Sequence, residues 1–136
     1  MGLRGTARKP TVLKILAGNP GGYPLPVNEP KPRATRPVCP AWLDTVGRKE
    51  WKRVAPELYR MGLLTKIDMP TLALYCDAYS QYIAARTKVK ECGLTHVLGN
   101  SGQIFTRPEV NIMARLSQQI RGWSHEFGFT PSARGQ

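Results

Sequence analysis

Proline and positive charge dominate the first 36 residues and limit where this chain can form a core. The segment holds six prolines and a Gly21–Gly22 pair. It carries seven cations against one acid, Glu29, for a local charge of +6. Proline interrupts regular backbone hydrogen bonding, and a segment with so few apolar side chains cannot bury a core of its own. We therefore expect a disordered basic arm that adds nothing to the core, attached to a domain beginning near Trp42.

Positive charge extends beyond this arm. The 136-residue chain has a net charge of +11, and residues 37–136 hold thirteen cations against eight acids. Such a surface attracts phosphate backbones from a distance, with strong salt dependence. A basic surface that only maintains solubility is the less specific alternative. We expect no membrane partner, because no apolar run approaches the roughly 20 residues of a spanning helix and no signal-peptide pattern follows Met1.

The spacing of apolar residues predicts a first principal helix after the arm. Asp44 is its expected N-cap, and Gly62 closes it. Pro56 lies inside this pattern and removes a hydrogen bond to the Lys52 carbonyl, so a kink or a break is expected there. Between the two ends, apolar side chains recur at helical spacing at Trp51, Val54, Leu58 and Met61.

Two further principal helices are expected, over residues 68–92 and 108–127. The earlier one starts at Thr65 or Asp68, and Pro70 favours Asp68, because the proline then falls in the first turn, where its missing N–H is harmless. Gly93 and Gly128 are the expected terminators. The helix over 68–92 has one continuous apolar stripe, formed by Met69, Leu72, Cys76, Tyr79 and Ile83.

A small β-hairpin is predicted over residues 94–106, between these two helices. Short β-prone runs flank the turn sequence Gly99–Gly102. A lone hairpin is marginally stable, so we expect it to lean on the helices or on a neighbouring subunit. The chain thus divides into an arm (1–41) with a possible short helix at 11–17, a helical core domain (42–128) with the hairpin near 94–106, and a tail (129–136).

No catalytic, metal or nucleotide constellation stands out. The two histidines, His96 and His125, fall on the predicted hairpin and the last helix, without a set of carboxylates at ligand spacing. The glycines of the arm are not followed by the Gly-Lys-Ser/Thr of a phosphate loop. Three cysteines with no paired spacing indicate neither a disulfide framework nor a zinc site, and suit a reducing compartment. We expect a protein that is not an enzyme and has no cofactor.

A series of short motifs in fixed order resembles the tailed-phage terminase small subunits of the short, proline-armed type. Together the motifs span roughly residues 9–134. Two departures, Arg107 in place of a frequent Asn and the early Pro70, affect only local helix starts. The motifs are Leu13–Gly21, Asn28–Pro32, Pro40–Leu43, Glu50–Leu58, Gly62–Thr65 leading into Asp68, Leu72–Cys76 and Gly128–Ser132.

This resemblance implies a non-enzymatic DNA-packaging factor acting in the host cytoplasm. Such subunits assemble into homo-oligomeric rings, engage double-stranded viral DNA, and recruit and regulate the large terminase subunit, which holds the ATPase and nuclease. The implied fold is mainly α and ring-forming, with three principal helices, the small hairpin and the basic arm. Apolar helix stripes that one subunit of this size cannot cover would be buried between subunits.

The residues expected to contact phosphates come from the arm and from the first long helix. For the residues of the arm, the alternative is a flexible tail that only maintains solubility. For those of the helix, it is a solvated helix face. A small helix-turn-helix regulator is the rival among DNA-binding proteins, since Gly62–Thr65 joins two helices, and it predicts a dimer on a palindromic site. A small metal-dependent phage nuclease is the rival among enzymes. The expected contacts are Arg4, Arg8, Lys9, Lys14, Lys31, Arg33 and Arg36 of the arm, and Arg48, Lys49, Lys52 and Arg53 of the helix.

Overall fold

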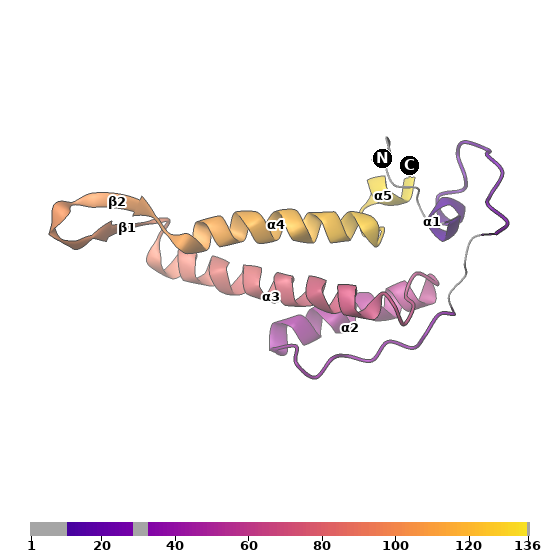
Figure 1. Cartoon of the computed structure of the whole chain (residues 1–136), viewed down its shortest axis with the longest axis horizontal. Helices are drawn as coiled ribbons and strands as arrows, with labels where there is room; N and C mark the ends of the chain where they lie inside the picture. The colour runs from indigo at the N-terminus through magenta and orange to yellow at the C-terminus, as the bar shows by residue number, and fades with distance from the viewer. Residues whose placement is uncertain (1–10, 29–32, 136) are drawn as a thin grey trace, which may run out of the picture.

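A computed structural model describes residues 11–28 and 33–135. In Figure 1, α3 and α4 run antiparallel as a long pair, α2 lies against α3 on the side away from α4, and the β-hairpin extends from the far end. The mainly helical fold with three principal helices and one small hairpin is thereby confirmed. In chain order the elements are α1 (Thr11–Leu16), α2 (Thr45–Arg60), α3 (Met69–Cys92), β1 (Thr95–Leu98), η1 (Gly99–Ser101), β2 (Gln103–Thr106), α4 (Pro108–Glu126) and α5 (Pro131–Gly135).

Helix α2 begins at the predicted cap and is held to α3 from that point. The Asp44 carboxylate accepts a hydrogen bond from the Gly47 amide at 2.7 Å and another from the Ser80 hydroxyl on α3. These two bonds, the Ser80 bond first, hold the pKa of Asp44 below its usual value. The helix is not broken at Pro56, which lies within its last turns. The carbonyl that lacks a donor belongs to Lys52, an exposed residue, so water can satisfy it.

Helix α3 is buried on more than the single stripe predicted for it. Leu72 and Cys76 of that stripe are fully buried, but Tyr75, Ala78 and Ala85 are buried too. The cause is its central position, because α2 packs on one side of α3 and α4 on another. Asp68 and Gly93 cap this helix at the two predicted ends, and Pro70 falls in its first turn.

The core lies where α2, α3 and the end of α4 meet. Its largest fully buried side chains are Leu43, Leu58, Leu64, Leu72 and Cys76. Beyond this region the pair of α3 and α4 is thinly packed, since Leu116 is the one buried residue in all of α4. Ile112, one turn before Leu116, remains exposed. Most other apolar side chains of α4 are half-buried, and Ile120 and Trp123 among them pack against the core.

Part of the predicted arm packs against the C-terminal end of the chain. The short helix expected near residues 11–17 is present as α1, and Leu13, only 3% exposed, sits over Gly128 beside α5. The expectation that the arm adds nothing to the folded structure is wrong for this residue. No sequence pattern indicated α5 in the expected tail. Further along the arm, Ala34 forms an isolated antiparallel bridge with Thr65.

The hairpin forms where it was predicted and points away from the helices. β1 pairs antiparallel with β2, with Val97 opposite Ile104 and His96 opposite Phe105. The turn needs left-handed backbone at Gly99 (φ 57°) and Gly102 (φ 69°), which glycine adopts without strain. Every residue of β2 is exposed. Because the strands extend beyond the helix ends (Figure 1), the hairpin does not lean on its own helices as one alternative proposed.

Candidate nucleic-acid interface

Exposed cations lie at the start of α2 and, separately, on the extended segment that leads into it, whose Ala34 bridges Thr65 near the other end of the helix. Arg48, Lys49 and Lys52 lie on the first two turns of α2 with exposed side chains. Arg33 and Arg36 are exposed on the segment before it. The Arg48 guanidinium donates to the Ala41 carbonyl at 2.6 Å, which joins this segment to the helix. In the described ranges, no ion pair involves any of these five cations.

Arg53, the last cation predicted on α2, differs because it pairs with a buried carboxylate. Its guanidinium donates two hydrogen bonds to Glu50, at 2.9 and 2.5 Å. Glu50 is 5% exposed and also accepts the Tyr75 hydroxyl at 2.8 Å. The bond to Glu50 raises the pKa of Arg53 above its ordinary value. Arg53 therefore has a structural partner, and a phosphate would compete with Glu50 for it.

The same network shifts the pKa values of the other two groups. Desolvation tends to raise the pKa of Glu50, but the hydrogen bonds from Arg53 and Tyr75 together outweigh it, and the pKa is lowered. Burial, followed by the hydrogen bond to Glu50, raises the pKa of Tyr75. Glu50 thus stays ionised as a buried acceptor, which is a structural role and gives no proton-transfer chemistry at neutral pH.

The remaining predicted arm cations are only partly placed. Lys14 lies on α1 and is half-buried. The others, Arg4, Arg8, Lys9 and Lys31, fall outside the described residues.

A second group of exposed cations was missed by the sequence reasoning. Arg86, Lys88 and Lys90 project from the last turns of α3, and Arg121 is exposed on α4. The signal that could have found them is the dense run of cations just before Gly93. A structural reason also accounts for the α3 group, because cations near a helix C-terminus interact favourably with its dipole.

The structure brings no catalytic or metal-binding cluster together within the residues it describes. No group of three or more His, Cys, Asp or Glu side chains there could hold a metal ion. His96 faces Phe105 across the hairpin, with ring centroids 6.0 Å apart, and His125 is exposed near the end of α4. Burial raises the pKa of Cys76 to about 12, so this thiol is not an activated nucleophile. None of the described helices is long and apolar enough to cross a membrane.

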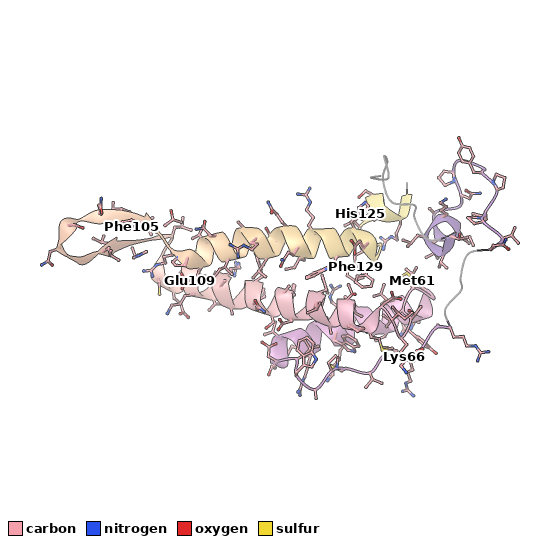
Figure 2. All side chains as sticks on the ribbon, in the orientation of Figure 1. Met61, Lys66, Phe105, Glu109, His125 and Phe129 are labelled. Carbon is pink, nitrogen blue, oxygen red and sulfur yellow. The ribbon has the colours of Figure 1, made fainter. Side chains whose placement is uncertain are left out.

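Two open hollows flank the core, and neither brings together residues for acid–base or nucleophilic chemistry. One, of about 380 Å³, is apolar and lies between Trp42 and the start of α3 at Met69 and Pro70. The other, of about 460 Å³, lies between α2 and the C-terminal end, with Phe129 on its wall and Arg134 at its edge. Figure 2 shows Phe129 and Met61 near this end of the bundle, while Phe105 and Glu109 lie toward the hairpin.

Comparison with known proteins bears on the family of this chain. No curated protein and no solved structure matches it. The family model described as phage terminase, small subunit, matches residues 47–136, which begins inside α2 and runs to the C-terminus. The match includes the cations of α2 and the hairpin but not the arm. Because it covers well over half of the chain and agrees with the motif order found in the sequence, the protein belongs to the phage terminase small-subunit family.

Proposed function

We propose that this protein binds double-stranded viral DNA as a homo-oligomeric ring and brings the large terminase subunit to it. Membership of the family supports a role in phage genome packaging, which would take place in the cytoplasm of the infected host. DNA binding, ring formation and recruitment of the large subunit are the finer parts of the proposal. The protein would itself be non-catalytic, and the large subunit would supply the ATPase and nuclease.

The observation that carries the DNA-binding proposal is the cluster of exposed cations at the start of α2. Lys49 and Lys52 have no ion-pair partner among the described residues and are free to meet phosphates. Arg33 and Arg36 lie apart from this cluster, on either side of Ala34, whose bridge to Thr65 places it near the other end of α2, and they would extend the contact with DNA along the segment. The positive N-terminal end of the helix dipole adds to the attraction of this region for phosphate. We leave Arg53 out of the proposed contacts because Glu50 holds it.

The helix-turn-helix alternative fits this geometry less well. A recognition helix must offer a polar face to the major groove, mostly from its N-terminal turns. In α3 those turns are buried at Leu72, Ala73 and Cys76, while their exposed positions are Pro70 and Leu74. This apolar exposed side favours contact with protein over reading of base edges.

The salt dependence of DNA binding tests the proposal directly. Each phosphate contact contributes about −0.9 to the slope of log affinity against log salt. Neutralising four cations (Arg33→Gln, Arg36→Gln, Lys49→Gln, Lys52→Gln) should flatten the slope by up to about 3.6 and weaken binding. The matched control neutralises four exposed cations elsewhere: Arg86→Gln, Lys88→Gln, Arg115→Gln and Arg121→Gln.

The outcomes separate the candidate functions. Equal flattening in both variants would refute this cluster as the interface and indicate a diffuse basic surface. An unchanged slope in the first variant would move the contacts to other cations. A protein that exists as a dimer and protects a palindromic site would support the helix-turn-helix regulator. Magnesium-dependent nicking of plasmid DNA by the purified protein would support the nuclease alternative.

A further inference from the structure

The β-hairpin lacks the features that normally stop strands from pairing with other chains. From Cys92 to Thr106 the sequence contains no Asp, Glu, Lys, Arg or Pro. Natural sheets protect exposed edges with charged side chains, prolines, bulges or a covering element. Here the sheet has only two strands, so β1 and β2 each present one outer edge of backbone donors and acceptors. The helices that could cover these edges, α3 and α4, do not extend alongside the hairpin (Figure 1).

Both faces of the hairpin also expose apolar side chains. Val97 and Ile104 are cross-strand partners on one face and are 61% and 71% exposed. Leu98 lies on the other face and is 59% exposed. A two-stranded hairpin is marginally stable by itself, whereas three or more strands with an apolar face are stable. The hairpin therefore has both the backbone edges and the apolar faces that further strands would complete.

We propose that the hairpins of neighbouring copies of this protein pair edge to edge, with the outer edge of β1 in one copy against the outer edge of β2 in the next. This inference rests on the proposed ring and names the element that joins its subunits. The product is one continuous antiparallel sheet with two strands from each copy.

The distribution of charge indicates that the partner of the exposed strand edges is a second copy of the chain. Each copy carries +11, so two copies repel each other over most of their surfaces. The hairpin is an uncharged stretch between Glu91 and Arg107. Self-association of a strongly basic protein is least opposed at such a place. A nucleic acid would gain no charge-assisted contact there.

Strand direction decides which edges meet in a ring. Around a rotation axis all hairpins point the same way, so β2 of one copy lies beside β1 of the next and runs antiparallel to it. The two edges differ in sequence, which makes the contact head-to-tail, and such contacts form a ring when the rotation from copy to copy closes. A two-fold dimer would instead place β1 against β1, or β2 against β2, with the hairpins pointing in opposite directions.

The structure allows the hairpin to be changed without disturbing the helices. The Arg107 amide donates to the Leu94 carbonyl at 3.0 Å, so the chain is already closed at the base of the hairpin. A short Gly-Asn-Gly turn can replace residues 95–106 while α3 and α4 keep their contact. A milder change is Ile104→Lys, which puts a charge on the exposed face. Gln118→Lys adds the same charge at an exposed position of α4 and serves as its control.

Native mass spectrometry and light scattering at equal subunit concentration measure the result. We expect wild type and Gln118→Lys to form the same large oligomer. Ile104→Lys should need at least a tenfold higher concentration to reach that mass, and the turn replacement should remain far smaller. Circular dichroism shows whether the helices persist in each variant.

Crosslinking tests which edges meet. Cys39 and Cys92 are replaced by Ser, while Cys76 is fully buried and stays. One preparation then carries Thr95→Cys on β1 and a second carries Thr106→Cys on β2. Head-to-tail pairing predicts that mild oxidation joins subunits by a disulfide when the two preparations are mixed and reassembled, and joins few in either alone, because equivalent residues of neighbouring copies are then two strand spacings, about 9.6 Å, apart. Equal linking within one preparation would indicate the two-fold arrangement and overturn the proposal.

The remaining outcomes distinguish this inference from the proposed function. If wild type forms a ring and both hairpin variants keep its mass, the hairpin proposal is wrong and the ring stands. If the variants keep the ring but no longer bind the large terminase subunit, the hairpin docks that partner and our assignment is wrong. A monomeric wild type at micromolar concentration refutes the ring and the hairpin contact together, while DNA binding by the basic cluster is tested separately.

Discussion

Removal of one hydroxyl, in Tyr75→Phe, should measurably destabilise the fold, because that hydroxyl serves a buried charge. Glu50 receives hydrogen bonds from two residues, Tyr75 and Arg53. A hydrogen bond to a charged group contributes about 1.5–3 kcal/mol to stability. The phenyl ring keeps the edge contact with Phe129, whose centroid is 5.3 Å away, so packing changes little. We expect a loss of about 2 kcal/mol, which lowers Tm by roughly 8–16 °C in a domain of this size.

Glu50→Gln supplies the matched background for this measurement. Its amide oxygen can still accept the Tyr75 hydroxyl, but the bond is then neutral and contributes only about 0.5–1.5 kcal/mol. Loss of the ion pair itself should cost under about 1 kcal/mol, because the Arg53 side chain is 67% exposed. Tyr75→Phe should therefore destabilise the Glu50→Gln variant less than it destabilises wild type. Equal losses in the two backgrounds would contradict the charged hydrogen bond.

Urea or thermal unfolding at one fixed subunit concentration provides the assay, since association raises the apparent stability. The pH dependence gives a second readout with a definite sign. The pKa of folded Glu50 is below its ordinary value of 4.5. Its contribution is therefore fully present above the unfolded pKa and is lost as pH falls through the lower folded pKa. Wild type should lose more stability than Glu50→Gln below about pH 4.5, and identical acid limbs would refute the network.

Two further changes test other parts of the structure. Gly128→Ala places a Cβ 2.7 Å from Leu13 Cδ2 at φ +70°, whereas Gly62→Ala has the same backbone strain (φ +69°) and open space. Amide exchange in α1 should accelerate in the first variant and not in the second, and equal exchange would contradict the docking of α1. Cys92 is exposed and should react with a thiol reagent at neutral pH within minutes, while Cys76, with its pKa raised to about 12 by burial, should react only on unfolding. Prompt labelling of Cys76 in the folded protein would show that this part of the core opens readily.

Local signals in the sequence predicted the helices and the hairpin well. Asp68 and Gly93 bound α3 as expected, and the turn glycines placed the two strands correctly. These features depend on residues a few positions apart, so a linear pattern contains them. Of the kink or break expected at Pro56, the break does not occur, because the surrounding helix is anchored on both sides of the proline by buried residues.

The features that the sequence did not predict depend on contacts between segments that are far apart in the chain. No role was expected for Glu50, because nothing near it in sequence shows that Tyr75, 25 residues later, lies beside it. The two-sided burial of α3 was missed because Ala78 and Ala85 are small and add little to an apolar stripe. The sequence predicted which cations of α2 are exposed. It did not predict that Arg53 pairs with Glu50, because that pairing follows from the burial of Glu50.

The contact between α1 and α5 also holds the basic arm in place only while the chain between α1 and α2 is unbroken. Leu13 and Leu43 are both buried, so the fold holds the chain on either side of the loop that joins them. Burial of one leucine is worth roughly 1.5–3 kcal/mol. That suffices while the covalent connection keeps α1 at a high effective concentration near α5, but it is far too little for a separate peptide to bind. A single proteolytic cut in this loop would therefore release α1 together with every cation that precedes it.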